Sequence, residues 1–408
     1  MPVYTIAIHV PIYVDGVQHF VISEWKRALE LLRDSFDGAF DRFILIAPSR
    51  PAEGAEVILE PLGMEDGFDL RPSISLDGSK RAYWLGGDRR RWKTDVAAAL
   101  DETDFAHTVI DNLYRPISLD ALRLVQAHSI PHAFFLDTDI IEQHHQLVAA
   151  GLMRRGLDLT LHDRLYARLL RGAVARADIA FLKGQALMQR YGDVAANPKL
   201  FQDTSYHSRE VVQEDVIEHR LAVRGTGALR LVYCGRLVAR KGCDHAIRIV
   251  AEARAAGADI TLDLIGDGPE RSALEAEAVG QGEGIRFLGE RPYGPELLQA
   301  LADYDALLFS PVAEDTPRMI FDGYAAGLPL LAYDIPYVQE RAAEEGATVL
   351  LPFGDIGASA KRVVETSGDS GRMAELTRAA LRAGQSNATD VWYRRRADWT
   401  SEAFRRAS

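Results

Sequence analysis

The C-terminal half of the chain alternates between short apolar runs and stretches with helical spacing, and this pattern constrains the fold most. The sequence predicts strands at 229–234, 260–265, 285–288, 306–309 and 329–333, with helices at 244–256, 269–278 and 295–303 between them. Apolar runs that alternate with helices are typical of βαβ units around a parallel sheet. We therefore expect a Rossmann-like α/β domain in this half.

The N-terminal half shows the same alternation less regularly. Strands are predicted at 4–10, 43–47, 106–111 and 132–137, and helices at 23–32, 118–128 and 163–175. Periodicity fails between residues 62 and 93, where we expect a long loop or an irregular insertion. A polar linker is expected within 197–227.

Length and composition limit the classes of protein. The chain has 408 residues, enough for two domains, and 47% of them are hydrophobic. Its formal net charge of −12 argues against a general nucleic-acid binder. Two cysteines without paired spacing predict no disulfide framework and fit a reducing compartment. The N-terminus reads as a core strand and no apolar run reaches membrane-spanning length, so we expect a cytoplasmic protein, with peripheral attachment to the inner face of the membrane as an option.

Two carboxylates flank the start of a predicted helix in the stretch SPVAEDTPRMIFDGYAAGLP. Glu314 precedes the helix, and Asp322 lies on it. Thr316 can cap the helix, Pro317 suits its first position, and Gly327 suits the left-handed residue after its last turn. Ligands bind at the carboxyl ends of strands in open α/β sheets, and a helix N-terminus there favours phosphate. The acid pair is therefore predicted to hold hydroxyl groups of a sugar or ribose.

A basic, glycine-containing loop follows the first strand of the C-terminal half, in the run CGRLVARKG. Gly235 and Gly242 allow a close approach of the backbone to a ligand. Arg236 offers a planar fork and Lys241 a point charge, and together they suit a diphosphate. The alternative is a solvated basic turn.

Two further loops follow the next predicted strands. Gly266 and Gly268, in IGDGP, suit a tight turn beside a nucleotide, although such turns are common. Arg291 lies in the next such loop, FLGERPYGPEL, for which a plain charged loop is one interpretation.

These motifs together resemble the signature of retaining GT-B glycosyltransferases of family four, within glycosyl transferases group 1. The family frame E-x-x-P-x-x-x-x-(acid)-x-x-A-x-G-x-P matches Glu314, Pro317, Asp322, Ala325, Gly327 and Pro329. The sequence departs from it at Asp322, where Glu is usual, and at Asp315 and Gly323, where Gly and Ala are usual. The resemblance implies two Rossmann-like domains that face an interdomain cleft. We expect residues 1–205, with a crossover helix at 391–408, to form the acceptor-side domain, and 206–390 the nucleotide-sugar domain.

The resemblance also implies roles for individual residues. Glu314 would bind hydroxyls of the transferred sugar, and Asp322 those of the ribose. Arg236 and Lys241 would neutralise the leaving diphosphate, so that no metal is needed. The remaining donor-side residues that it implies are Gly235, Gly266, Gly268, Arg291, Asp315, Thr316, Pro317 and Arg318.

Signals are sparser in the N-terminal half. Gly16 occupies the place of the family's glycine-rich loop, and Asp137 and Asp139 follow a predicted strand. We expect these acids to be acceptor-side polar residues; a helix cap or turn is the second interpretation, and a metal site the third. The adjacent His144 and His145 are expected at the surface, and the basic run DRRRWK is expected in a solvated loop.

The implied reaction moves a sugar from a nucleotide diphosphate sugar, UDP- or GDP-linked, to an acceptor hydroxyl with retention. The acceptor would be a glycan, a lipid-linked glycan or a small molecule. Two alternatives stay open: another GT-B enzyme, such as a sugar-nucleotide epimerase or hydrolase, and a non-catalytic nucleotide-sugar-binding protein.

Overall fold

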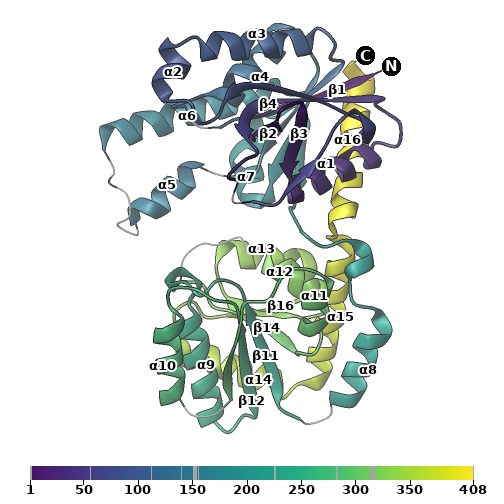
Figure 1. Cartoon of the computed structure of the whole chain (residues 1–408). Coiled ribbons are helices and arrows are strands. Elements are labelled where there is room, and N and C mark those ends of the chain that lie inside the picture. Colours follow the sequence, from purple (N-terminus) through teal and green to yellow (C-terminus); the bar gives the residue numbers. More distant parts are fainter. Residues whose placement is uncertain are drawn as a thin grey trace. The chain divides into compact units, whose positions relative to one another are not determined.

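The computed structural model describes residues 2–55, 57–111, 113–138, 140–149, 154, 156–224, 227–281, 284–312 and 318–407. The chain forms two compact units (Figure 1). The N-terminal unit comprises Met1–Gln202 and Tyr393–Ser408, and the C-terminal unit comprises Asp203–Trp392.

The C-terminal unit is built on a parallel sheet with strand order β13-β12-β11-β14-β15-β16. Its strands are β11 (Leu229–Cys234), β12 (Ile260–Ile265), β13 (Ile285–Gly289), β14 (Ala306–Phe309), β15 (Leu330–Tyr333) and β16 (Thr348–Leu351). The strands predicted from the apolar runs are thereby confirmed to within a residue at each end, and β16 is added.

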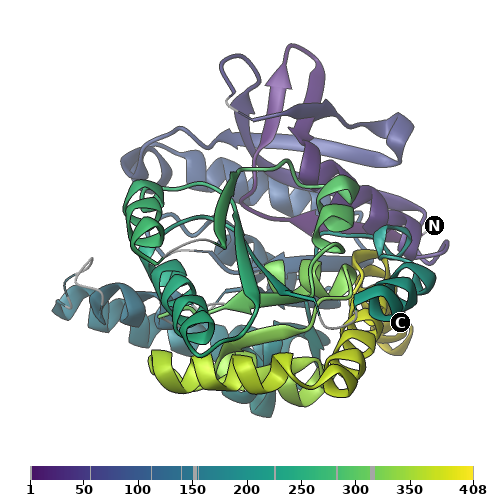
Figure 2. The same ribbon diagram turned by 90° about the horizontal axis from the view of Figure 1, so that it is seen from below.

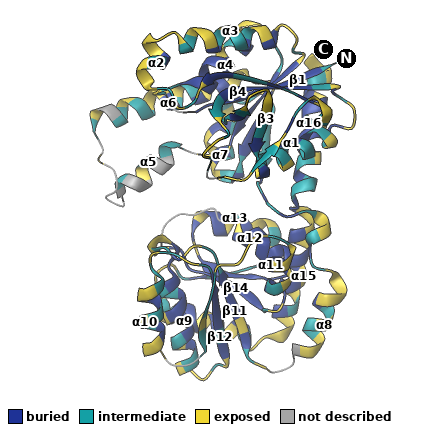
Figure 3. Cartoon of the chain, viewed as in Figure 1, coloured by how far each residue is buried: buried dark blue, intermediate teal, exposed yellow. Residues whose placement is uncertain are grey.

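Helices cover both sides of this sheet (Figure 2). The central strands β14 and β15 are buried along their whole length, as expected when both faces are covered (Figure 3). The helices are α8 (Glu214–Arg224), α9 (Cys243–Ala255), α10 (Arg271–Gly280), α11 (Pro295–Leu301), α12 (Met319–Ala325), α13 (Pro336–Glu345), α14 (Ile356–Ser367) and α15 (Ser370–Ser386).

The N-terminal unit also has a largely parallel sheet, with strand order β10-β9-β8-β7-β1-β4, and β6 pairs with β4. An antiparallel extension, β2-β3-β5, joins at the end of β4. The strands are β1 (Val3–Ala7), β2 (Ile12–Asp15), β3 (Gln18–Ile22), β4 (Arg42–Pro51), β5 (Leu59–Pro61), β6 (Phe68–Ser75), β7 (Phe105–Val109), β8 (His132–Leu136), β9 (Ile179–Lys183) and β10 (Pro198–Phe201).

The helices of this unit include one from the far end of the chain. They are α1 (Ser23–Ser35), α2 (Lys80–Leu85), α3 (Asp88–Leu100), α4 (Ile117–Ala127), α5 (Ile140–Ala149), α6 (Leu157–Arg176), α7 (Gly184–Tyr191) and most of α16 (Thr389–Ala407). Phe404 of α16 contacts the rings of Phe40 and Phe105, at centroid distances of 5.0 and 6.0 Å. Both partners also contact Tyr4, so the last helix completes an aromatic cluster in the core of this unit.

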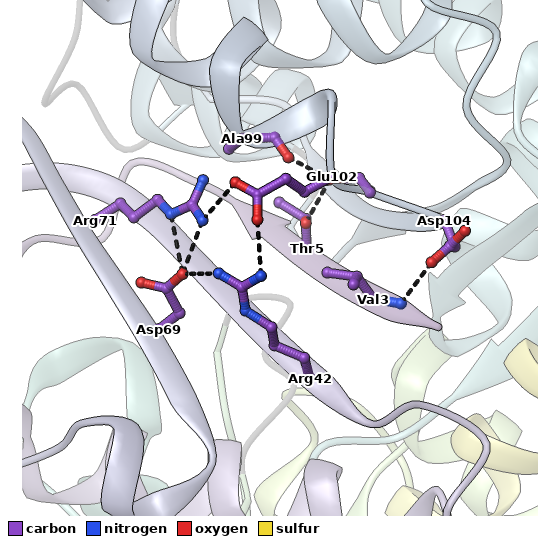
Figure 4. Close-up of polar contacts among 9 residues, drawn as sticks. Val3, Thr5, Arg42, Asp69, Arg71, Ala99, Glu102 and Asp104 are labelled. Atoms are coloured by element: carbon purple, nitrogen blue, oxygen red, sulfur yellow. Dashed lines mark hydrogen bonds and ion pairs between the residues drawn. The ribbon is translucent and has the colours of Figure 1, made fainter. Parts of the chain in front are cut away.

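Ion pairs link neighbouring strands near their amino-terminal ends in the N-terminal sheet (Figure 4). Arg42 at the start of β4 binds Asp69 of β6 and, at 2.7 Å, Glu102 before β7. Arg71 binds the same two acids, each at 2.8 Å. Asp104 accepts a hydrogen bond from the backbone N–H of Val3, at 2.7 Å. This edge is therefore occupied by structural contacts.

One prediction about an irregular segment was wrong. The interval 62–93 contains β6, α2 and the first turns of α3. The boundary between the two units, after Gln202, lies within the expected linker 197–227, although β10 and α8 also fall in that range. Strand β6 was missed because Pro72 and Arg71 interrupt its apolar pattern, although it pairs in parallel with buried β4. Tertiary pairing overrode a weak local signal here.

No helix in the described ranges is both long enough and apolar enough to cross a membrane.

Candidate functional site

The C-terminal sheet has a topological switch point between β11 and β14. From β11 the chain continues outward to β12 and β13, then returns to add β14 on the other side of β11. Ligands of open α/β sheets bind at the carboxyl ends of the strands at such a point. The loops after β11 and β14 are the two that carry the basic and acidic motifs.

These two loops are locked together by their backbones. Gly242 has φ +62°, and a β-carbon there would overlap the carbonyl oxygen of Ser310. The Ser310 hydroxyl donates to the Gly242 carbonyl at 2.8 Å, and the Val312 amide donates to the Arg240 carbonyl at 3.1 Å. Gly242 is thus required for contact between loops, whereas the sequence suggested contact with a ligand.

The two predicted cations lie on this loop in different environments. The side chain of Lys241 is buried, with Nζ 5.8 Å from the centroid of the Phe309 ring at the end of β14. Arg236 is exposed, and its backbone carbonyl accepts a hydrogen bond from the Tyr233 hydroxyl at 2.9 Å. One cation is therefore held inside the strand-end loops and the other projects into solvent.

The predicted glycines of the neighbouring loops pack on the β11 loop. A β-carbon on Gly266, which has φ +142°, would overlap the Gly235 carbonyl oxygen, and one on Gly268 would overlap that of Leu237. The Gly235 amide donates to Ile265 and the Gly266 amide to Gly289, at 2.9 and 2.8 Å. These glycines let three strand-end loops stack closely.

Part of the acidic loop lies outside the described residues, namely Glu314, Asp315, Thr316 and Pro317 together with Ala313. The helix expected after it is present, and the structure describes it from Met319, with Arg318 preceding it. Gly327 has the expected left-handed conformation, with φ +66°. The Arg318 guanidinium turns to the Ser205 hydroxyl at 3.3 Å and to Asp203 at 3.9 Å.

Asp322 is buried on α12 and already has a partner. Its Oδ1 accepts a hydrogen bond from the Tyr293 hydroxyl at 3.0 Å. Burial raises the pKa of Asp322 to about 7, although the Tyr293 hydroxyl and Arg318 act in the opposite direction. Arg291, two residues before Tyr293, is exposed. The sequence reading missed Tyr293; the signal was a hydroxyl-bearing aromatic residue in a loop already proposed to face the nucleotide.

The described N-terminal residues predicted for the acceptor side lie on different elements. Gly16, with φ +57°, lies in the turn between antiparallel strands β2 and β3, and no described atom would contact a β-carbon there. Asp137 is exposed just after β8, and Asp139 lies outside the described residues.

A second switch point, between β1 and β7 of the N-terminal sheet, brings together residues that the sequence reading did not select. His9 follows β1, and its Nδ1 lies 3.0 Å from the Ser118 hydroxyl at the start of α4. Asp111 follows β7 and is buried beside the first backbone amides of α4. Burial raises the pKa of Asp111 to about 7, although those amides lower it. Their position in the sequence, just after two adjacent strands, could have indicated them.

The basic run DRRRWK, expected in a solvated loop, instead forms the first turns of α3. Arg89 forms a bidentate ion pair with the buried Asp120, with distances of 2.5 and 2.7 Å, and Trp92 is buried completely. The partner acid lies 31 residues away, so no local pattern indicates this pairing.

A comparison with known protein families gives a match in the C-terminal unit. Residues 228–369 match the family model described as Glycosyl transferases group 1. The match lies wholly within Asp203–Trp392 and spans the loops described above.

Individual relatives are similar over part of their length. The chain is 28% identical over 171 residues to the 2-deoxystreptamine glucosyltransferase of Streptomyces kanamyceticus, a match covering 41% of this chain and 43% of that one. It is 29% identical over 113 residues to the GtfA subunit of the UDP-N-acetylglucosamine–peptide N-acetylglucosaminyltransferase of Streptococcus agalactiae, covering 27% and 21%. The chain thus spans less than half the length of these curated relatives.

Solved structures match over almost the whole chain. HepE of Anabaena, in complex with UDP, is similar with a TM-score of 0.63 at 15% identity, covering 97% of this chain and 98% of that one. The sucrose-phosphate synthase of Thermosynechococcus elongatus is similar with a TM-score of 0.61 at 13% identity, covering all of both chains. At these identities the likeness establishes the fold: two Rossmann-like domains of the GT-B type.

Proposed function

We propose that the protein is a retaining glycosyltransferase that moves a sugar from a nucleotide diphosphate sugar to an acceptor hydroxyl. One observation carries this proposal: a buried lysine and an exposed arginine share the loop at the switch point of the C-terminal sheet. The family match over residues 228–369 and the GT-B fold support it.

Departure of the diphosphate dominates the chemistry in this proposal. Lys241 and Arg236 stabilise the negative charge that develops on the leaving group, as fixed donors do in an oxyanion hole. Packing against Phe309 keeps the Lys241 ammonium in a fixed position, so little reorganisation is needed during reaction. Because these cations neutralise the diphosphate, the proposed transfer uses no metal at this site. Glu314, from the sequence resemblance, binds the transferred sugar.

Asp322 takes the ribose side of the donor in this proposal, together with Tyr293. Its short side chain is buried and accepts from the Tyr293 hydroxyl, which is itself half exposed in the loop after β13. The ribose hydroxyls would therefore meet a tyrosine–aspartate pair. This arrangement offsets the missing methylene relative to the family's glutamate.

The donor is proposed to be UDP- or GDP-linked, with UDP favoured because HepE is described in complex with UDP and with UDP-glucose. The relatives suggest the first acceptors to try. One is named for 2-deoxystreptamine and another for a peptide, so aminocyclitols and peptides belong beside glycans in an acceptor panel.

A nucleotide-sugar screen tests the donor half of the proposal. We expect UDP- or GDP-sugars to raise the melting temperature of the full chain, because a ligand that binds only the folded state stabilises it by mass action. The shift should persist in EDTA, and release of UDP or GDP should require an acceptor from the panel. Donor hydrolysis at equal rates without acceptor would instead support a hydrolase, and stabilisation by no nucleotide sugar would overturn the proposal.

The acidic loop allows an independent test. Glu314→Gln keeps the size of the side chain and removes its charge, and we expect it to abolish sugar transfer while the nucleotide alone still binds. Normal turnover in this variant would contradict the role given to Glu314.

A further inference from the structure

Three metal-ligating side chains meet between α5 and α6 of the N-terminal unit. His144 Nδ1 lies 2.8 Å from Asp163 Oδ1, and His162 Nδ1 lies 3.2 Å from the same oxygen. The three ligand atoms all lie within 4.8 Å of one another. Figure 1 shows the two helices as neighbours at one margin of the unit.

The surroundings hold the His162 imidazole in place. Its side chain is 10% exposed and that of Asp163 is 12% exposed. The His162 ring is nearly parallel to the rings of Tyr114 and Tyr166, at centroid distances of 5.4 and 5.8 Å. Its Nε2 is buried and has no hydrogen-bond partner among the described residues. The stacked ring therefore presents Nδ1, and not Nε2, to Asp163, and Nδ1 is the nitrogen that would bind an ion.

The spacing and the ligand types suit a small divalent transition metal. In a tetrahedral zinc site with bonds of about 2.0 to 2.2 Å, ligand atoms lie roughly 3.3 to 3.6 Å apart. The His162 Nδ1–Asp163 Oδ1 distance of 3.2 Å is close to that separation, and the His144 Nδ1–Asp163 Oδ1 distance of 2.8 Å would lengthen by about half an ångström around an ion. Two imidazoles and one carboxylate are a common zinc donor set, whereas Mg²⁺ and Ca²⁺ prefer oxygen ligands alone. The competing explanation is a carboxylate that accepts hydrogen bonds from two imidazole N–H groups, without any metal.

We propose that His144, His162 and Asp163 form a binding site for one divalent transition-metal ion of the zinc type. His144 comes from α5 and the other two ligands from α6, so the ion fastens the short helix after β8 to the long helix that follows. The Ile140 and Ile141 side chains of α5 pack against the same apolar cluster that contains Tyr166. The ion therefore adds metal–ligand bonds to the small apolar contact made by Ile140 and Ile141, and its role is structural.

This site is separate from the proposed diphosphate chemistry. Its three ligands belong to the N-terminal unit, whereas Arg236 and Lys241 belong to the C-terminal unit. The inference therefore stands or fails independently of the proposed function.

Metal binding by the full chain without a histidine tag tests the proposal. The protein is stripped with a chelator, freed of it by gel filtration, and titrated with Zn²⁺ while bound metal is measured by mass spectrometry. We expect one equivalent of tight Zn²⁺, and substitution by Co²⁺ should give the visible absorption bands of a tetrahedral nitrogen–oxygen site. Zn²⁺ should also raise the melting temperature of the stripped protein.

Variants separate the metal site from the hydrogen-bond explanation. Asp163→Asn keeps the shape and can still accept an imidazole N–H, and we expect it to weaken Zn²⁺ binding at least tenfold. His162→Ala should do the same. The matched control is His128→Ala, which removes an exposed histidine hydrogen-bonded at 2.8 Å within its own helix and should bind metal like the unmodified chain.

The possible outcomes are distinct. Absence of stoichiometric Zn²⁺ binding would overturn the proposal, and so would equal binding by the unmodified chain and Asp163→Asn. If His162→Ala fails to fold, Asp163→Asn decides alone. The nucleotide-sugar shift should be unchanged in Asp163→Asn, which keeps this result distinct from any failure of the proposed transferase function.

Discussion

The two sheets share a topology at their centres but differ in what surrounds it. Each has a switch point, between β11 and β14 in the C-terminal unit and between β1 and β7 in the N-terminal unit. The first carries Lys241 and Arg236 on tightly packed loops, whereas the second carries His9 and the buried Asp111. One edge is built to attract an anion, and the other offers a histidine and a carboxyl group whose pKa burial raises. Under the proposed function, the first edge would bind the charged donor, and we expect the second to face the uncharged acceptor hydroxyl.

Two glycine-containing turns, one in each unit, show the same contrast. Gly242 is hemmed in by the Ser310 carbonyl, while Gly16 lies in a hairpin turn with open space around it. The C-terminal loop is therefore specified residue by residue, and the N-terminal one tolerates variation.

Removing the buried cation should give the largest effect. Lys241→Ala leaves the growing diphosphate charge without its fixed partner, and we expect kcat/KM for sugar transfer to fall roughly a hundred- to a thousandfold. Steady-state kinetics measure this, with circular dichroism to verify the fold. Arg240→Ala, which removes the exposed neighbouring cation, is the matched control and should change kcat/KM little. Equal losses in both variants would contradict a specific role for Lys241.

Alanine substitutions at Gly242 and Gly16 test how differently the two turns are packed. Gly242→Ala forces a left-handed alanine into contact with the Ser310 carbonyl and should cost roughly 2 to 4 kcal/mol of folding stability. Gly16→Ala meets only the conformational cost, on the order of 1 kcal/mol. Thermal unfolding of the two variants measures the difference. Similar melting temperatures would show that the C-terminal loops can move apart.

The buried Asp322 predicts a pH dependence of stability. Its folded-state pKa of about 7 lies above the ordinary value of 3.8, so the unfolded chain releases the proton first as pH rises. The carboxyl group therefore costs stability progressively between about pH 4 and 7, and the cost is constant above that range.

Asp322→Asn removes this cost and keeps an acceptor for Tyr293. We expect its melting temperature, relative to the unmodified chain, to rise by several degrees between pH 5 and 8, or roughly 2 to 3 kcal/mol. Asp303→Asn, at an exposed position of the same unit, should show a difference that does not change with pH. A flat difference for Asp322→Asn would mean that the carboxyl is ionised in the folded protein throughout.

The smallest effect is expected at the N-terminal switch point. Asp111 positions the start of α4, and with it Ser118 and His9, so Asp111→Asn should lower kcat roughly tenfold with the donor KM unchanged. The pH–rate profile should also lose a limb near pH 7, which a purely structural change would not remove. Asp104→Asn makes the same replacement at the opposite edge of the sheet and should leave the profile intact. A raised donor KM in Asp111→Asn would assign this edge to the donor.

The sequence predicted the C-terminal fold well because its strands are short and apolar, and β14 and β15 are buried along their whole length. Gly327 has the left-handed conformation expected of it. The N-terminal unit was harder to predict because its structure depends on distant partners. From the sequence alone, Arg89 looks like one of several cations in a loop. Only the folded structure brings it to Asp120, 31 residues away.

The loops of the candidate site could be predicted from the sequence because the ends of the apolar strands can be located there. Such reading located the loops of Arg236 and Lys241, but it could not show that one cation is buried and the other exposed. Nor could it foresee that Tyr293 would donate to Asp322, because that bond depends on how two loops fold over each other. His144 and His162 belong to separate helices, so no local motif joins them.

Helix α16 gives the chain an order of assembly. Its last turns bring Phe404 to Phe40 and Phe105, which lie some three hundred residues earlier in the chain. Translation delivers residues from the N-terminus onward, so every strand of the first unit is made before this helix is. The aromatic core of the first unit can therefore be completed only after the whole second unit has been synthesised. A chain cut before Tyr393 would hold all the strands of the first unit and lack the ring that completes its aromatic cluster.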